Sequence, residues 1–271
     1  YQTFFDTTLR LNYTVELLPD AIQEGFNNTF DAYSKEDDDG GNPANRLTII
    51  HDSTDAGQSV FHMVDSTVKG MDINALVRLH QAFAGNNDFN DIMGQHGLGF
   101  YLLLYRLLGD TDADGWTVLS SPYETGNIFV ATCNLAGIRA GGKPDFYMVP
   151  SNLKDNVYRD DYLKAMARHL GRPYKTEREM RKSKFRDLLF DTHGTVIQVR
   201  TTRKFGGVGQ SLADYYATEV VPALSRQIHL SGTGTVKVIV DGKRMALSNS
   251  YFVRRDEYMQ AKFTLKDEEW H

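Results

Sequence analysis

The stretch Gly94-Gln-His-Gly-Leu-Gly-Phe-Tyr101 holds three glycines within six residues and runs directly into an apolar segment that ends at Leu108. This pattern predicts a glycine-rich turn over Gly94 to Gly99 and a helix over Phe100 to Leu108. The first N–H groups of a helix have no partner within it, and together with the helix dipole they bind phosphate oxygens. Three glycines are more than a tight turn needs, so the stretch favours an anion-binding loop.

Earlier in the chain, Leu17 to Tyr33 repeats apolar residues at spacings of three and four, which predicts an amphipathic helix. Glu24, Asn28 and Asp31 follow one another at offsets of four and seven, so they share one face of that helix. Polar groups beside a core are costly unless each has a partner. The face is therefore either an ordinary hydrated surface or a set of functional side chains.

Two further features lie at strand ends. Asp65 ends a predicted strand and is followed by Gly70 and Met71. A carboxylate there accepts a hydrogen bond from an exocyclic amine, and a glycine lets the backbone approach a flat ring closely. The alternative is a plain strand-end turn. Gly194-Thr195 opens another strand and carries no information by itself.

The remaining pattern predicts an α+β fold. Strands are expected over 46–51, 60–64, 116–120, 128–132, 196–200 and 235–241, and helices over 73–83 and 212–228. A turn at 53–58 makes the first two strands a hairpin, 34–43 reads as a loop, and 141–186 reads as irregular and helical. Because strands and helices alternate without a regular βαβ rhythm, a two-layer α/β sandwich is favoured over a doubly wound parallel sheet.

Composition excludes several classes. The 271 residues have a net charge of −5, with 41% hydrophobic and 24% charged residues, as in ordinary globular proteins. Cys133 is the only cysteine, which excludes an intramolecular disulfide and a cysteine zinc cage. No apolar run reaches the ~20 residues of a membrane-spanning helix, so no membrane partner is expected. Phosphate-binding P-loop, dinucleotide, metalloprotease and serine hydrolase motifs do not occur.

Charge is concentrated in one segment, residues 159–186, where ten Lys or Arg residues stand against four acids. This segment is either a nucleic-acid footprint or a hydrated helical face. Two sequons, at 12–14 and 27–29, are interpreted as chance matches, because no signal-like start precedes them and an intracellular protein, cytoplasmic or nuclear, is expected. The chain starts at Tyr1 rather than Met, so a fragment of a longer protein is expected.

The order of the four local features resembles the GHKL superfamily of Bergerat-fold ATPases, which includes gyrase B, heat-shock chaperone ATPases, sensor histidine kinases, MutL and the microrchidia ATPases. Glu24 to Asp31-Ala32 is similar to the family's N-box, and Asp65 to Met71 to its Asp-x-Gly-x-Gly-Met box. Gly94 to Tyr101 is very similar to the chaperone form of the glycine box, and Gly194-Thr195 to the last box. The matching pieces run from about residue 15 to residue 200. The resemblance implies a two-layer α/β sandwich of the Bergerat type, with a mixed sheet covered on one face by helices.

The resemblance implies a role for each position. Glu24 would be the general base and Asn28 the Mg²⁺ ligand, with Asp31 nearby in the ATP site. Asp65 would hold the adenine amine, Gly70 and Met71 would border the base, and Thr195 would help to fix the base through water. The phosphates would be cradled along the glycine box, by residues Gly94, Gln95, His96, Gly97, Leu98, Gly99 and Phe100. The cofactors expected are ATP and Mg²⁺, and the activity expected is ATP hydrolysis.

Some alternatives stay open within this family. The second box has Thr67 where relatives usually have glycine, and one extra residue before Gly70; a register on Asp52 to Gly57 is the alternative to Asp65. The intact Glu24 argues for hydrolysis rather than histidine phosphorylation. One GHKL domain over 1–271 is expected, with a mostly helical basic insertion at about 141–190.

Relatives close as ATP-bound dimers, so a nucleotide-gated homodimer is expected, of the chaperone or the microrchidia type. A microrchidia-like protein would act on DNA, and the basic segment 159–186 would suit that partner. The altered second box motivates another hypothesis, a degenerate nucleotide-binding or scaffold domain without turnover.

Overall fold

The computed structural model describes eight stretches of the chain, and every structural statement below concerns these residues. They are 18–34, 47–54, 57–65, 70–80, 99–121, 127–149, 194–228 and 236–247. Within 18–34 the backbone is helical throughout, while side chains are described for 18–26.

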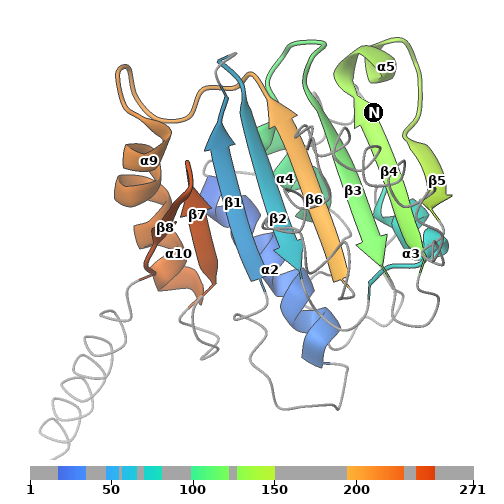
Figure 1. Ribbon diagram of the computed structural model, residues 1–271, viewed down its shortest axis with the longest axis horizontal. Coiled ribbons are helices and arrows are strands. Elements are labelled where there is room, and N and C mark those ends of the chain that lie inside the picture. Colours follow the sequence, from blue (N-terminus) through green and yellow to red (C-terminus); the bar gives the residue numbers. More distant parts are fainter. Residues whose placement is uncertain are drawn as a thin grey trace, which may run out of the picture.

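The described strands form one open sheet in the order β5-β4-β3-β6-β2-β1-β7-β8 (Figure 1). Neighbouring strands are antiparallel except β1 and β7, which are parallel, so the sheet is mixed as expected. The bounds are β1 Leu47–Ser53, β2 Ser59–Asp65, β3 Gly115–Ser121, β4 Ile128–Asn134, β5 Asp145–Val149, β6 Gly194–Thr201, β7 Lys237–Val240 and β8 Lys243–Met245.

Helices α2 and α4 lie behind this sheet in the view of Figure 1 and pack against each other. The bounds are α2 Leu18–Ser34, α3 Ile73–Leu79, α4 Gly99–Leu107, α5 Leu135–Arg139, α9 Leu212–Tyr215, the π-helical turn η3 Tyr216–Val220 and α10 Val221–Ile228. The fold is therefore α+β, and its arrangement is compatible with a two-layer α/β sandwich.

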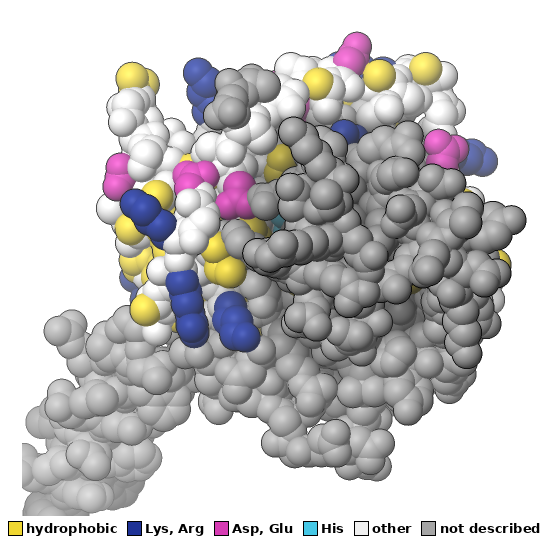
Figure 2. All heavy atoms as spheres, in the orientation of Figure 1, with side chains coloured by type: hydrophobic (Ala, Val, Ile, Leu, Met, Phe, Trp, Pro, Cys, Tyr) yellow, Lys and Arg dark blue, Asp and Glu magenta, His cyan; other side chains and the backbone are white. Residues whose placement is uncertain are grey.

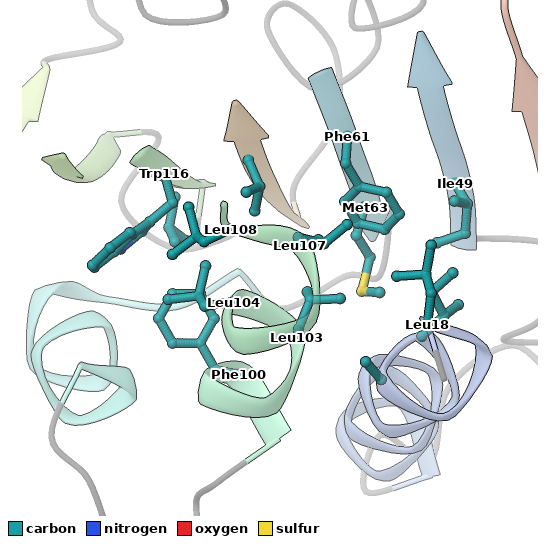
Figure 3. Packing of buried hydrophobic residues seen from close by; sticks show 14 of the residues in the cluster. Leu18, Ile49, Phe61, Met63, Phe100, Leu103, Leu104, Leu107, Leu108 and Trp116 are labelled. Atoms are coloured by element: carbon teal, nitrogen blue, oxygen red, sulfur yellow. The ribbon is translucent and has the colours of Figure 1, made fainter. Parts of the chain in front are cut away.

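The main core lies between the sheet and these helices (Figure 3). Because side chains alternate across a strand, every second residue faces the helices; Phe61 and Met63 of β2 and Trp116 of β3 belong to this set. Helix α2 contributes Leu18, Ala21, Ile22 and Phe26 to the same core. Burying each large side chain stabilises the fold by about 1.5–3 kcal/mol.

Asp114 stabilises the end of the sheet at which β3 begins, through hydrogen bonds to two neighbouring segments. Its carboxylate accepts hydrogen bonds from the backbone N–H groups of Gly109 (2.6 Å) and Thr202 (2.8 Å) and from Thr111 Oγ1 (2.9 Å). The side chain is fully buried. One carboxylate thus joins the segment after α4 to the start of β3 and the end of β6.

Most predicted elements are confirmed within one or two residues, including α2, α4 and the β1–β2 hairpin. The predicted helix 73–83 corresponds to α3, which ends at Leu79; residues 81–83 lie outside the described part. The predicted helix 212–228 is interrupted by the π-helical turn η3. The predicted strand 235–241 is shorter and pairs with β8, which no sequence pattern indicated.

One expectation is wrong at the start of the proposed insertion. Residues Asp145–Val149 were expected to be irregular or helical, yet they form the edge strand β5, which pairs with β4. The pairing of Phe146 with Ala131 and of Met148 with Phe129 explains this, because an edge strand is stabilised by its neighbour rather than by its own pattern. The rest of the predicted insertion, 150–190, lies outside the described residues.

Candidate functional site

Three residues of neighbouring strands form one row at an end of the sheet. Asp65 of β2 pairs with Thr195 of β6, and Thr195 pairs in turn with Ser120 of β3. Two residues further along each strand lie Met63, Ile197 and Val118, all of which face the helix layer. Because side chains repeat with a period of two, the row faces the same layer. Two positions predicted for the adenine site, Asp65 and Thr195, are thus adjacent.

Ser120 connects this row to the segment after β2. The backbone N–H of Met71 donates a hydrogen bond to Ser120 Oγ (2.5 Å), and Ser120 Oγ lies 3.0 Å from Thr195 Oγ1. Met71 and the preceding Gly70 are the two positions expected to border the base. The structure therefore gathers four predicted residues, Asp65, Gly70, Met71 and Thr195, around a serine that the sequence did not single out.

Two residues of this row are less buried than the residues in the other half of the same strands. In the opposite half of the same strands, Phe61, Trp116 and Val199 are all 0% exposed. Asp65 and Thr195, in contrast, are only partly buried, and so are Met71 and Gly70. A carboxylate and a hydroxyl thus belong to partly exposed residues at the margin of the core, and such a margin suits a ligand with both an apolar face and polar edges.

Helix α2 passes over β2 beside the row. A Cβ at Gly25 would fall within 3.0 Å of the Sδ and Cε atoms of Met63, so helix and strand are in close contact there. Met63 precedes Asp65 by two residues, or about 7 Å along the strand. Glu24, next to Gly25, is partly buried. Glu24, the predicted general base, therefore lies on the part of α2 that packs against β2 near Asp65.

The two other N-box positions are described only in part. Asn28 and Asp31 belong to the helical backbone of α2, so the expected spacing of four and seven residues from Glu24 is realised on a helix. Their side chains lie outside the description, and so does any role in holding a metal. In the described part of the chain, no group of three or more His, Cys, Asp or Glu side chains is arranged for a metal ion.

The glycine box is described from Gly99 onward. Gly99 and Phe100 begin helix α4 and are buried. The Phe100 ring packs against His80, with the ring centroids 4.9 Å apart, so this side chain belongs to the core while its N–H lies in the first turn. Gly94, Gln95, His96, Gly97 and Leu98 lie outside the described residues, and the expected phosphate cradle remains a prediction.

His80 is a second buried residue that the sequence did not indicate. Trp116 Nε1 donates a hydrogen bond to His80 Nε2 (3.2 Å), and His80 Nδ1 lies 2.9 Å from the Leu76 carbonyl oxygen. Because an indole N–H only donates, Nε2 is the acceptor and Nδ1 carries the proton. Burial lowers the pKa of His80 to about 4, against the opposite effect of the Leu76 hydrogen bond. His80 is thus a neutral structural residue.

His51 is similar in this respect. Its two ring nitrogens lie 2.9 Å from the Tyr216 hydroxyl and 2.9 Å from Ser59 Oγ. Burial lowers the pKa of His51 to about 3. A Ser–His–Tyr arrangement could suggest a nucleophile, but His51 and Tyr216 are 0% exposed, so no substrate reaches them. This cluster holds η3 against β1.

The alternative register of the second box places its aspartate elsewhere. Asp52 lies near the end of β1, opposite Val60, at the other end of the hairpin from Asp65. Its Oδ1 accepts a hydrogen bond from the N–H of Gly242 in the β7–β8 turn (3.2 Å). Asp52 therefore connects the end of β1 to the β7–β8 turn. It lies at the other end of the hairpin from the residue that pairs with Thr195, so Asp65 is the better candidate for the adenine contact.

The basic segment 159–186 lies outside the described residues. The Lys and Arg side chains at the lower left of Figure 2 lie over β7 and β8, where Lys237, Lys243 and Arg244 are exposed. These side chains lie near the edge of the sheet and are not part of the basic segment 159–186. In the stretches that the structure covers, no helix combines the length and apolar character required to cross a membrane.

Comparison with protein-family models and with curated proteins found no match to this chain.

Proposed function

We propose that this chain is a Mg²⁺-dependent ATP-binding and ATP-hydrolysing module of the GHKL type, with a Bergerat fold. The observation that carries the proposal is the row of Asp65, Thr195 and Ser120 at the partly exposed margin of the helix–sheet core. Separate sequence motifs, 130 residues apart in the case of Asp65 and Thr195, meet there in register. Helix α2 brings Glu24 to the same part of β2.

The chemistry of this row suits the base of ATP. The Asp65 carboxylate accepts a hydrogen bond from the exocyclic amine of adenine, since an ionised carboxylate only accepts. The Thr195 hydroxyl forms a second polar contact beside it. Gly70 lacks a side chain, so the backbone there approaches a flat ring closely. Partly buried Met71 and Ile197 add apolar surface for the faces of the ring.

The residues proposed to act on the phosphates of ATP belong to α2 and to the segment that leads into α4. Glu24 would accept the proton of the attacking water, a contribution of ~10²–10⁴ in rate for a positioned general base. Asn28 supplies an amide oxygen, a ligand type that suits Mg²⁺, and the ion would neutralise phosphate charge. Backbone N–H groups of the 94–100 segment would hold the phosphate oxygens.

The decisive experiment is calorimetric titration of Mg-AMPPNP into the wild-type protein, Asp65→Asn and Asp52→Asn. Both variants remove one carboxylate from the same hairpin, but only Asp65 lies in the row. We expect binding by the wild type and by Asp52→Asn, and a loss of at least ~10-fold in affinity for Asp65→Asn, in line with a hydrogen bond to a charged group. Loss in Asp52→Asn alone would support the other register.

No binding by any of the three proteins would overturn the proposal and favour a scaffold domain without nucleotide. Binding without turnover would favour the degenerate nucleotide-binding domain.

The proposal extends to assembly and partners. Nucleotide-gated homodimerisation predicts that Mg-AMPPNP doubles the mass measured by analytical ultracentrifugation. A nucleic-acid partner for residues 159–186 predicts DNA affinity that falls steeply with salt, because phosphate contacts release counterions. A mass that stays monomeric, or DNA binding that is undetectable at low salt, would remove the corresponding part of the proposal.

A further inference from the structure

We infer that Ser120 is a positioning residue for base recognition, which sets the direction of the Thr195 hydroxyl and anchors the Met71 backbone without touching the nucleotide. This inference rests on the proposed function, since it assigns a selectivity device to the same site. The carrying observation is that one fully buried hydroxyl lies within hydrogen-bond distance of both Met71 N and Thr195 Oγ1.

The hydrogen-bond inventory of a serine limits how the three groups are arranged. A hydroxyl has one proton and two acceptor sites. The Met71 N–H can only donate, so it occupies one acceptor site of Ser120 Oγ. The serine proton then goes either to Thr195 Oγ1, 3.0 Å away, or to the Gly194 carbonyl oxygen, 3.4 Å away. Either hydroxyl can be the donor in the 3.0 Å contact, and the serine proton is assigned to Thr195 Oγ1, the nearer of its two acceptors.

Burial of Ser120 makes this arrangement persistent. Ser120 is 0% exposed, so water does not compete for its proton. When Thr195 Oγ1 accepts from Ser120, its own proton points away from Ser120, toward the partly exposed side of the row. Thr195 therefore presents a donor next to the acceptor that Asp65 presents on the neighbouring strand.

An acceptor beside a donor is complementary to the C6–N1 edge of adenine but not to that of guanine. Adenine carries an amine at C6, which donates, and N1, which accepts. Guanine carries O6, which accepts, and N1–H, which donates. Polar groups that are left unpaired in a recognition site are a strong source of discrimination. Ser120 thus contributes to the preference for adenine through Thr195.

The test compares binding of Mg-AMPPNP and Mg-GMPPNP to the wild type, Ser120→Ala and Thr117→Val. Thr117 is the matched control because it lies on β3, is buried, and shares a hydroxyl contact with Thr132 (3.1 Å) on the other face of the sheet. We expect Ser120→Ala to lower the AMPPNP-to-GMPPNP affinity ratio about 10-fold, the effect of one buried hydrogen bond. The Thr117→Val ratio should stay within about 2-fold of the wild type.

Binding of 1-deaza-ATP, which has a carbon in place of N1, separates positioning from general structural support. Ser120→Ala should weaken ATP more than 1-deaza-ATP, because the analogue already lacks the contact through Thr195 while loss of the Met71 anchor affects both ligands. Equal weakening of both ligands would overturn the inference while the proposed function stands. A wild type that binds no nucleotide would instead overturn the proposed function.

Thr195→Val covers the case in which Ser120→Ala does not fold. It removes the hydroxyl that Ser120 orients, so it should reproduce the loss of the AMPPNP-to-GMPPNP ratio. A Thr195→Val protein with the wild-type ratio would overturn the inference as well.

Discussion

Gly25 of helix α2 lies directly against Met63 of strand β2, with no room for a Cβ between them. This contact sets how closely the helix of the proposed general base approaches the sheet. It also explains a glycine in the middle of a helix, where glycine otherwise costs about 1 kcal/mol relative to alanine.

Gly25→Ala should therefore fail to stabilise the protein, in contrast to an ordinary helix position. Overpacking costs about 1–3 kcal/mol, although the flexible thioether of Met63 absorbs part of it. The overpacking should offset the gain in helix propensity of about 1 kcal/mol, so we expect little net change in stability by urea denaturation. In a Met63→Ala background the same substitution should stabilise the protein by about 1 kcal/mol. Additive effects in this double-mutant cycle would show that the two residues do not interact.

Substitution of Glu24 tests the hydrolytic step. Glu24→Ala should keep its affinity for Mg-AMPPNP within about 3-fold and lose ~10²–10⁴ in turnover, since a general base acts on the water and not on nucleotide binding. Asp20→Asn is the matched control, because Asp20 lies one turn earlier on α2 and is also partly buried. Normal turnover by Glu24→Ala would remove Glu24 from the mechanism.

Acid should destabilise the fold through His80. Its pKa is about 4 when folded and 6.5 when exposed, so the neutral form is favoured by folding. This contribution is complete above pH 6.5 and is lost as the pH falls toward 4, by about 3 kcal/mol at 1.36 kcal/mol per pKa unit. Protonation would also set an N–H of the ring against the Trp116 indole N–H.

The measurement is urea denaturation at pH 7, 5.5 and 4.5 for the wild type and His80→Gln. The glutamine side chain has no proton to gain in this range, so the variant should lose less stability between pH 7 and 4.5. Parallel pH curves for the two proteins would contradict the assignment. Burial lowers the pKa of His51 to about 3, so His51 adds an acid sensitivity of similar size to both proteins over the same pH range.

Asp114 and Asp112 offer a matched pair of carboxylates with opposite expectations. In Asp114→Asn, the buried N–H groups of Gly109 and Thr202 face an amide in place of a carboxylate. Each unsatisfied group costs roughly 1–3 kcal/mol, so the free energy of unfolding should fall by about 2–4 kcal/mol. Asp112 forms an exposed ion pair with Arg139 (2.6 Å), so Asp112→Asn should cost less than about 1 kcal/mol. Equal losses in thermal denaturation would contradict the role of Asp114 as a buried anchor.

Sequence periodicity predicted the parts of this fold that depend on local order. The spacing of Leu18, Ile22 and Phe26 predicts helix α2, and alternation predicts that Phe61 and Met63 face the same side of β2. These patterns follow from 3.6 residues per helical turn and two per strand repeat, so they are readable without knowing any neighbour. Strand β5 was not predicted, because its stability comes from pairing with β4 rather than from a local pattern.

The amino-acid sequence by itself determined the α+β class, most helix and strand bounds, and the candidate positions Glu24, Asp65 and Thr195. Only the tertiary structure decided that Asp65 rather than Asp52 adjoins Thr195, and that Ser120 joins Met71 to that row. Cross-strand register and a hydrogen bond between residues 49 apart in sequence create these relationships. No local pattern encodes them, because they depend on how separate strands align when the shared core is buried.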